Sequence, residues 1–487
     1  MTSPTQTNTA PSRETLLQTV AAWFDNGHYA RLLAARVRHP TASEECAEDV
    51  LTAYLQDNIT PYLQDLDFHC EVIANPLPGM LPVLIARRIE DAALPTMLTY
   101  GHGDVVRGQD AQWRAGLQPW ALTLEGDRWY GRGTADNKGQ HTINLAALAH
   151  VIQARQAQGG RLGYNVTVLL EMGEEVGSPG LRELCAQEQE RLRADVFIAS
   201  DGPRVHAAQP TVFLGSRGIV NFSLHLKSRD RAFHSGNWGG VLTNPAVVIA
   251  NAVSCMVGPR GAMLVEGLQP PPISDDIRAA LAGVDVGTGE DDPATDPAWG
   301  RSELSASERL HAWNTLEVLA LGAGSIERPV GAIPYQATAH CQLRFVPGTD
   351  WQNLESTVRA HLDAHGFEDV VVTVTAATPA TRLSLQSPWV AWTLASLQQS
   401  TGKTPTLLPN LAGSLPNDAF AEILGQATLW IPHSYPACAQ HAPNEHILGS
   451  VAKEGLLMMA GLFWDLGAQA SASAAAPNTA PWATPHA

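Results

Sequence analysis

The sequence predicts an α/β fold with a mostly parallel sheet, into which a smaller α+β domain is inserted. Strand-like and helix-like segments alternate between residues 96 and 206, which is typical of strands joined by crossover helices. After about residue 206 the pattern changes to a strict alternation of apolar and polar residues, as in a half-buried antiparallel strand. The chain of 487 residues also exceeds the size that one hydrophobic core usually serves.

The α/β part begins with helices. A helical period starts at Glu14, and a second helix is expected around residues 44–63. Short apolar runs rich in β-branched residues then predict strands, and longer segments between and after them predict helices. The strands are expected at 96–100, 166–170 and 196–200, and the helices at 144–158 and 181–192.

The inserted part has a different period. Residues 220–227 and 337–345 alternate apolar and polar side chains, so an antiparallel strand with one buried face is expected at 220–227 and another half-exposed strand at 337–345. Asn244 before Pro245 predicts a capped helix start, and the helix is expected over 246–256. A helix from about residue 350 and a strand at 370–374 complete this unit. Residues 258–306, rich in Pro, Gly and Asp, are expected to form a long surface excursion with some helix.

The chain then returns to the α/β pattern, with a helix at 389–399, a strand at 427–431 and a helix at 451–466. Two domains are therefore expected, one formed by residues 14–206 with 379–466 and the other by residues 207–378. The tails 1–13 and 467–487 contain little apolar surface to offset the entropy of ordering, so we expect them to be disordered.

Composition excludes several classes of function. The net charge of −17 argues against nucleic acid, whose phosphates require a basic patch. No apolar run approaches the roughly 20 residues that span a bilayer, and the first residues do not resemble a signal peptide. The six cysteines show no Cys-x-x-Cys spacing, so free thiols in a reducing cytoplasm are expected.

Acidic and imidazole side chains follow the expected strands. His102 follows the first strand, Glu174 and Glu175 follow the second, and Asp201 follows the third. Because ligands of such sheets gather beyond the carboxyl ends of the strands, these side chains are expected to meet there. Two adjacent carboxylates are destabilised by repulsion and burial unless a cation compensates them. With Asp104, Asp136 and His441, they have the composition of a site for two divalent cations.

Simpler interpretations exist for each residue alone. The Glu174–Glu175 pair is also compatible with a solvated acidic loop, and Asp201 with a turn before Gly202. His441 could satisfy a loop, and His433 is a competing ligand. All of these interpretations would have to hold together to remove the metal site.

Five segments together resemble the M20 family of metallopeptidases, in the order that the family has them. The resemblance covers about residues 14–466. The segments are Gly101-His-Gly-Asp104, Tyr130-Gly-Arg-Gly-Thr-Ala-Asp-Asn-Lys-Gly139, Glu171-Met-Gly-Glu-Glu-Val-Gly-Ser178, Ser200-Asp-Gly-Pro203 and His441-Ala-Pro-Asn-Glu445. The fold implied is a zinc-peptidase-like catalytic domain with a ferredoxin-like lid and dimerisation domain.

The resemblance also implies a role for each residue of the site. Asp136 would bridge two Zn²⁺ ions, for which Co²⁺ or Mn²⁺ are possible substitutes, and a cis peptide would follow it. The remaining ligands would be His102 with Asp201 on one ion, and Glu175 with His441 on the other. Asp104 would fix the tautomer of His102, and Glu174 would be the general base that later protonates the leaving amine.

Substrate-binding residues are implied in the same way. His234 resembles the histidine that polarises the scissile carbonyl from the partner subunit, although Ala232-Phe233 replaces the usual Asp-Leu before it. Arg344 resembles the arginine that binds the substrate carboxylate, and Asn244 a residue that contacts substrate. Gly413 and Ser414 resemble a carboxylate-binding loop, in which Ala412 replaces a glycine. Ordinary alternatives are a loop histidine, an exposed strand arginine and a plain helix cap.

The expected function is hydrolysis of a peptide or amide bond that releases a free amino acid. A dipeptidase or carboxypeptidase is the first choice, because the long 258–306 segment resembles the carnosinase-like branch of the family. An N-acyl amino acid deacylase is the alternative, and a non-catalytic metal-binding interaction protein is a remote one. The expected partners are a small peptide or N-acyl amino acid substrate and a second copy of the chain, which would form a homodimer through the lid. Neither nucleic acid nor a membrane is expected as a partner.

Overall fold

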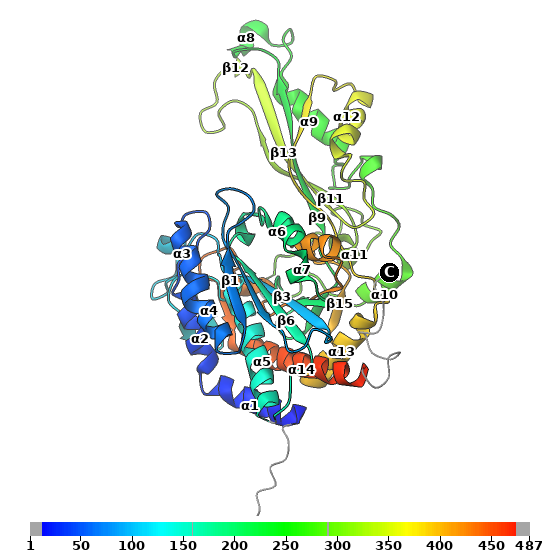
Figure 1. Ribbon diagram of the computed structural model, residues 1–487. Coiled ribbons are helices and arrows are strands. Elements are labelled where there is room, and N and C mark those ends of the chain that lie inside the picture. Colours follow the sequence, from blue (N-terminus) through cyan, green and yellow to red (C-terminus); the bar gives the residue numbers. More distant parts are fainter. Residues whose placement is uncertain (1–11, 158, 290–291, 474–487) are drawn as a thin grey trace, which may run out of the picture.

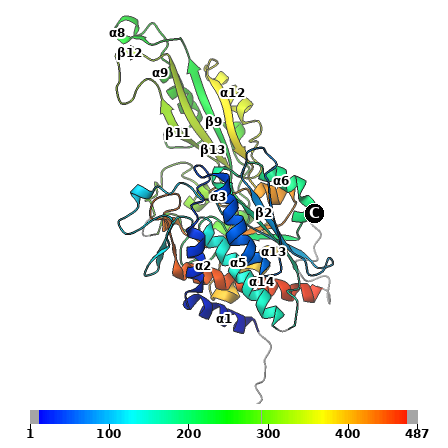
Figure 2. The same ribbon diagram turned by 60° about the vertical axis from the view of Figure 1, so that its left-hand side comes forward.

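The structure is a computed structural model that describes residues 12–157, 159–289 and 292–473. Figure 1 shows a broad body built on an eight-stranded sheet, and a narrower unit built on a four-stranded sheet that projects from it. The same projection is seen after a 60° turn in Figure 2. We call the four-stranded sheet the lid, together with helices α8 (Ser235–Trp238), α9 (Pro245–Met256) and α12 (Leu354–Ala364). This arrangement confirms the expected α/β fold with a smaller inserted unit.

The central strands of the large sheet are parallel. The strands β6, β3, β7 and β16 run in the same direction, and the register places His102 of β3 beside Glu171 of β6. Antiparallel pairs lie towards the edges, at β1–β2, β2–β6 and β16–β8. In order across the sheet, the strands are β1 (His69–Ile73), β2 (Val83–Arg88), β6 (Asn165–Glu171), β3 (Thr96–His102), β7 (Val196–Ala199), β16 (Thr428–Trp430), β8 (Thr211–Phe213) and β15 (Thr406–Leu408).

Helices cover both faces of this sheet, because alternate strand residues enter different cores. Val168 and Leu170 join the core under the long helices, whereas Leu169 joins the core on the opposite face. The first core is formed with α1 (Arg13–Asp25), α2 (His28–Val37), α3 (Glu48–Ala53), a π-helical turn (Tyr54–Ile59), α4 (Thr60–Gln64), α5 (Lys138–Gln156), α13 (Pro388–Thr401) and α14 (Gly449–Ser473). The second core is formed with α6 (Leu181–Gln187), α7 (Gln189–Leu192), α10 (Asp275–Leu281) and the π-helical turn Ala419–Ile423.

The lid sheet is antiparallel throughout and has one buried face. Alternate residues of its strands, including Phe222, Leu224 and Cys341, pack beneath α9 and α12, as the alternating sequence predicts. In order, its strands are β11 (Thr315–Gly322), β13 (Gln336–Phe345), β9 (Gly218–Lys227) and β14 (Val371–Thr378), and its helices are α8 (Ser235–Trp238), α9 (Pro245–Met256) and α12 (Leu354–Ala364).

Smaller elements complete the described chain. A two-stranded ribbon lies at the tip of the lid, and a three-stranded sheet lies beside the large one. The ribbon consists of β10 (Phe233–His234) and β12 (Ala332–Ile333), and the small sheet of β17 (His446–Leu448), β5 (Arg128–Tyr130) and β4 (Thr123–Glu125). Single 3₁₀ turns occur at Asp110–Gln112, Glu174–Val176, Glu266–Leu268 and Pro436–Cys438.

The expected excursion at 258–306 is only partly a surface segment. It contains α10, and the helix α11 (Ala306–His311) follows it. Ile277 and Leu281 of α10 are buried in the same core as Phe213 and Leu408 of the large sheet. The segment therefore leaves the lid and packs back onto the body, which ties the two units together.

Strand β8 and helix α2 differ from the sequence-based expectation. Strand β8 lies within the range expected for the inserted domain, yet it pairs with β15 and β16, so the lid sheet begins at Gly218. Three residues are too few to show a period, which explains the difference. Helix α2 was not predicted.

At the ends of the chain, Arg13 forms an ion pair with Asp465 at 2.9 Å, and α14 continues to Ser473, so neither tail is wholly irregular. The remaining tail residues, 1–11 and 474–487, lie outside the described part of the chain. No helix among the described residues has the length and apolar content needed to cross a membrane.

Candidate metal centre

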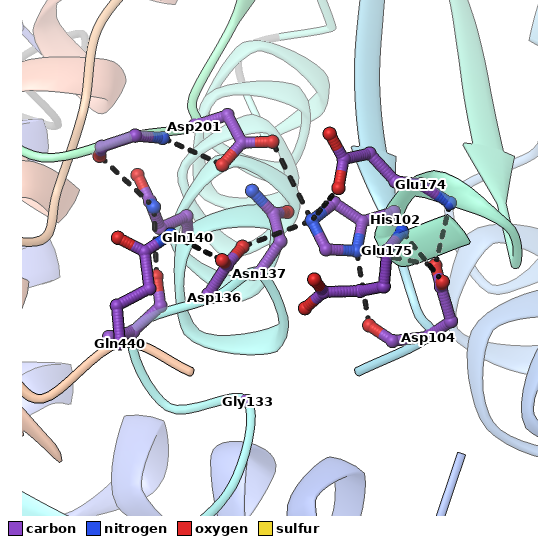
Figure 3. Close-up of polar contacts among 12 residues, drawn as sticks. His102, Asp104, Gly133, Asp136, Asn137, Gln140, Glu174, Glu175, Asp201 and Gln440 are labelled. Carbon is purple, nitrogen blue, oxygen red and sulfur yellow. Dashed lines mark hydrogen bonds and ion pairs between the residues drawn. The ribbon is translucent and has the colours of Figure 1, made fainter. Parts of the chain in front are cut away.

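The candidate ligands lie together where three parallel strands of the large sheet reach their carboxyl ends. His102 is the last residue of β3, Glu174 and Glu175 form the turn after β6, and Asp201 follows β7. Asp136 lies in the loop before α5, next to a cis peptide bond between Asp136 and Asn137. The expected cis peptide is therefore present, and the side chains converge as predicted from the strand ends (Figure 3).

Asp136 lies between two groups of ligands. Its Oδ1 atom is 3.1 Å from His102 Nε2, and its Oδ2 atom is 3.0 Å from His441 Nε2. The first group is completed by Asp201, whose Oδ2 atom lies 3.6 Å from His102 Nε2. The second is completed by Glu175, whose Oε2 atom lies 3.0 Å from His441 Nε2. In each group, the ligand atoms all lie within 4.8 Å of one another.

Asp104 links the first histidine to the acidic turn. Its Oδ1 atom lies 3.3 Å from His102 Nδ1, and its two oxygens accept hydrogen bonds from the backbone N–H groups of Glu174 and Glu175. A completely buried carboxylate thus positions the imidazole of His102 and the turn that carries both glutamates. The Glu174 carboxylate lies 3.9 Å from His102 Nε2 and, like Asp104, belongs to neither ligand group.

Glu445 holds the loop that carries Asp136. Its buried carboxylate accepts hydrogen bonds from the backbone N–H groups of Gly133, Ala135 and Asp136, and from Arg132 Nη1 at 2.8 Å. Gly139 allows the first turn of α5 to approach the same loop, because a Cβ atom there would lie 1.9 Å from the Thr134 carbonyl oxygen. The position of Asp136 is therefore set by Glu445, which is distant in sequence, and by the first turn of α5, which follows the loop directly.

The electrostatics of the cluster favour added positive charge. Burial, together with the nearby Asp136 carboxylate, raises the pKa of Asp201 to about 6 and the pKa of Glu175 to about 7. Burial opposes the charge on Asp136 too, but hydrogen bonds with His102 and His441 outweigh it and hold the pKa of that carboxyl far below its usual range. The hydrogen bonds to Asp136 and Glu175 raise the pKa of His441 to about 11. The carboxylates thus stabilise the protonated form of the imidazoles.

The residues present fit two divalent cations. Glu175 Oε1 and Asp201 Oδ2 are buried and have no hydrogen-bond partner among the described residues, an arrangement that is costly unless a cation binds there. Two carboxylate–imidazole groups with one shared aspartate provide the mixed nitrogen and oxygen donors that zinc prefers in an open site. Cations would take the place of the protons that the two histidines otherwise hold.

His433, the competing histidine, has a different role. Its ring is buried, and Nε2 lies 3.0 Å from the Ser200 hydroxyl. His441, rather than His433, lies beside Asp136 and Glu175. The choice of His441 from its Pro-Asn-Glu context agrees with this placement.

The expected carboxylate-binding residues meet where the lid joins the body. Arg344 Nη1 donates to Ser414 Oγ at 3.2 Å, and Gly413 lies beside Ser414 in the same loop. Arg217, which was not predicted, holds this loop, because its Nε donates to the Ala412 carbonyl at 2.8 Å. Burial and the charge of Arg344 lower the pKa of Arg217 to about 10. The two guanidinium groups thus repel each other and favour the binding of an anion.

A cavity of about 380 Å³ opens beside these two arginines, and it is lined in part by Trp299 and Trp313.

Two expected substrate residues lie elsewhere in this chain. His234 is exposed in β10, which pairs with β12 and directly precedes α8, and both of these elements lie at the tip of the lid, remote from the large sheet (Figure 1). Asn244 is the N-cap of α9, and its side chain accepts a hydrogen bond from Ala246 N at 3.0 Å. The structure therefore does not bring either residue to the metal cluster of its own chain.

Some residues of the site were missed by the sequence-based prediction. Gln440 Nε2 donates to Asp136 Oδ2, and Glu171 accepts hydrogen bonds from the Tyr100 hydroxyl at 2.7 Å and the Ser178 hydroxyl at 2.9 Å. Glu171 and Glu445 were recognised as parts of motifs, but no role was assigned to either. The apolar run that ends in Glu171 could have indicated a buried carboxylate with hydrogen-bond partners, because a buried carboxylate needs such partners. Gln440 carries no such signal apart from its place before His441.

A parallel sheet whose strand ends carry two ligand groups with one shared aspartate defines a metal-dependent hydrolase of the two-metal type. Comparison with known proteins agrees with this class. The family model "Peptidase family M20/M25/M40" matches residues 98–465, so the chain belongs to that peptidase family.

Three known proteins illustrate the relationship. The Beta-Ala-His dipeptidase of Rattus norvegicus is 26% identical over 407 residues, which cover 79% of this chain and 80% of the relative. The Cys-Gly metallodipeptidase of Saccharomyces cerevisiae is 26% identical over 62% of this chain and 63% of its own length. The crystal structure of human carnosine dipeptidase 1 superposes with a TM-score of 0.75 at 22% identity, covering 94% of this chain and 100% of that chain, and shares the fold.

Proposed function

We propose that this protein is a two-metal dipeptidase, which hydrolyses the peptide bond of a short peptide with a free carboxyl terminus. The observation that carries the proposal is the position of Asp136, whose two carboxylate oxygens face two separate ligand groups. Membership of the peptidase family and the names of the two dipeptidase relatives support the same class of reaction.

The metal ligands in this proposal are His102 and Asp201 on one side, Glu175 and His441 on the other, and Asp136 between them. Zinc is the proposed metal, because its preferred donors are those of the cluster, and Co²⁺ or Mn²⁺ are possible substitutes. When bound, the ions would polarise the substrate carbonyl and lower the pKa of water.

Glu174 is the proposed general base. Burial raises the pKa of its carboxyl well above the usual value, so this group holds a proton more strongly than an ordinary glutamate does. Glu174 would take a proton from the attacking water and deliver it to the leaving amine. Asp104 supports both steps, because it holds the backbone of Glu174 and the imidazole of His102 in place.

Arg344 is proposed to bind the terminal carboxylate of the substrate, together with the loop of Gly413 and Ser414. A guanidinium binds a carboxylate through two parallel hydrogen bonds. The nearby Arg217 adds positive charge at the same place, which supports an anionic group of the substrate there. A dipeptide has such a carboxylate one residue from its scissile bond.

We further propose a homodimer formed through the lid, in which His234 of one subunit serves the site of its partner. The exposed position of His234 at the lid tip supports a role outside its own chain. Strand β11 is an edge strand, and its exposed Val318, Leu319 and Leu321 provide an apolar surface for a second copy. Asn244 would contact substrate from the same unit. Six free cysteines support a reducing, cytoplasmic location.

A substrate panel tests the proposal. Dipeptides, their C-terminal amides and N-acyl amino acids are incubated with the protein, with and without a chelator, and the released amino acid is measured. We expect dipeptides to be cleaved, and chelator to abolish the cleavage. Faster cleavage of N-acyl amino acids would replace the dipeptidase with the deacylase alternative, and activity insensitive to chelator would overturn the two-metal proposal.

A further inference from the structure

A second cluster of metal-ligand side chains lies in the lid, away from the site described above. It consists of Cys255 in the last turn of α9, His361 in the last turn of α12 and His365 directly after that helix. One ligand atom from each residue lies within 4.8 Å of the other two. The proposed peptidase mechanism uses none of these residues.

The geometry of the two helices creates the cluster. His361 and His365 are four residues apart, so their side chains lie on the same face one above the other, with ring centroids 4.4 Å apart. His361 Nε2 lies 2.9 Å from the Cys255 carbonyl oxygen, which directs that ring towards the end of α9. The thiol of Cys255 is at the same end, where it donates to the Ala252 carbonyl.

The hydrogen bond of His365 leaves one nitrogen able to bind a cation. Its Nδ1 lies 2.7 Å from the His361 carbonyl oxygen, and a carbonyl oxygen can only accept, so Nδ1 carries the proton. The lone pair is then on Nε2, which is the usual ligand atom of a metal-bound histidine when Nδ1 donates to a carbonyl. His365 is exposed and free to adjust its rotamer.

We propose that Cys255, His361 and His365 form a third metal site, which binds one zinc-like ion of borderline softness. One thiolate and two imidazoles are donors that Zn²⁺ and Co²⁺ bind well, whereas Mg²⁺ and Ca²⁺ prefer oxygen. The usual bond lengths place the donors of a tetrahedral zinc about 3.5 Å apart, so small side-chain rotations suffice. Water would complete the coordination at this partly exposed position.

The alternative interpretation is that the two histidines only cap the end of α12. Histidines near a helix C-terminus interact well with its free carbonyl groups, and both rings here contact carbonyl oxygens. If the histidines only cap the helix, the nearby thiol of Cys255 has no role, and no metal should bind through sulfur. A bound metal would instead join the ends of α9 and α12 and stabilise the lid.

Cobalt provides a direct test, because a thiolate bound to Co²⁺ gives a near-ultraviolet charge-transfer band. The proposed peptidase ligands contain only nitrogen and oxygen, so they cannot produce this band, and the test is independent of the proposed function. The full chain is freed of metal, kept reduced without added thiols and titrated with Co²⁺. We expect three ions per chain and one thiolate band, with Zn²⁺ displacing the cobalt.

Variants assign the band to the cluster. Cys255→Ser and the double variant His361→Ala/His365→Ala should each lose the band and one of the three ions, while dipeptide hydrolysis stays at the level of the unchanged protein. Cys70→Ser, which removes another partly buried thiol, should retain both. The absence of a thiolate band in the unchanged protein, or its persistence in Cys255→Ser, would overturn the proposal. Retention of the band in the double histidine variant would also overturn it.

Discussion

At the scale of single residues, the two adjacent glutamates have different environments. Glu175 belongs to a ligand group, with Oε2 3.0 Å from His441, whereas Glu174 belongs to neither group and lies 3.9 Å from His102. Both are held by the same partner, because their backbone N–H groups donate to Asp104. One of the two adjacent carboxylates, Glu175, is therefore placed to bind a cation, and the other, Glu174, is left free to transfer protons.

Replacement of Glu174 by glutamine should separate these two tasks. The amide keeps the size of the side chain but cannot accept the proton of the attacking water, so we expect kcat to fall by about 10²–10⁴-fold. The metal content, measured by elemental analysis, should remain that of the unchanged protein. Glu183→Gln, a change on an exposed face of α6, is the matched control. A Glu174→Gln protein with normal kcat would remove Glu174 from the mechanism.

Arg344 can be tested through the substrate instead of the metal. A hydrogen bond to a charged group contributes about 1.5–3 kcal/mol, so Arg344→Ala should raise KM for dipeptides by about ten- to a hundredfold. Dipeptide amides, which lack the terminal carboxylate, should show little change. KM is measured for both series, with Arg161→Ala as the exposed arginine control. An equal rise in KM for acids and amides would contradict the proposed carboxylate contact.

At the scale of elements, the strand ends explain why much of the site could be predicted. His102, Glu174 and Asp201 each follow a short apolar run, and parallel strands must end at the same edge of their sheet. The ranges of β3, β6, β7, β9 and β13 agree with the periodic segments of the sequence. The three-residue strands β8 and β15 are too short to show a period and were missed, whereas β16 of the same length was predicted within 427–431.

Contacts between loops could not be predicted in this way. Glu445 reaches across the fold to Arg132 and to the loop of Asp136, over more than 300 residues of sequence. The position of Arg217 beneath the loop of Ser414 likewise depends on how the lid meets the body. Local sequence patterns cannot predict these long-range contacts, because the contacts are set by tertiary packing.

The loop of Asp136 gives a prediction at this scale. Glu445→Gln would leave the buried Arg132 without its partner charge, and breaking a buried pair costs about 3–5 kcal/mol. We expect a lower midpoint of thermal unfolding and weaker metal binding, because Asp136 loses its support. Calorimetry and a metal titration measure the two effects, and Glu183→Gln again serves as the control. An unchanged midpoint and unchanged metal affinity would show that Glu445 does not hold this loop.

At the scale of the whole molecule, the fold separates the metal cluster from His234. The cluster lies after the carboxyl ends of β3, β6 and β7, whereas His234 lies in β10, which pairs with β12 at the tip of the lid (Figures 1 and 2). In the arrangement of this chain, His234 does not reach its own metal cluster. If His234 takes part in the reaction in this arrangement, it must therefore act at the metal cluster of a second subunit. The exposed edge strand β11 offers a surface on which two lids could associate.

A mixture of two inactive variants tests this exchange. Glu174→Gln lacks the base but retains His234, and His234→Ala has the opposite defect, so each should be inactive alone. In a mixed dimer, one site would combine the intact Glu174 of one subunit with the intact His234 of the other. Random exchange forms mixed dimers in about half of the population, with one active site in two, so about a quarter of the unchanged activity should return.

The control for subunit exchange is the introduction of a charge into the apolar edge. Leu319→Lys, placed in both variants, should weaken association of the lids, as measured by the molar mass in solution, and should prevent the recovery of activity on mixing. Full activity of His234→Ala alone would remove this residue from catalysis. Failure of the mixture to recover activity, although mixed dimers have formed, would show that His234 acts within its own chain, which would require the lid to close onto the body.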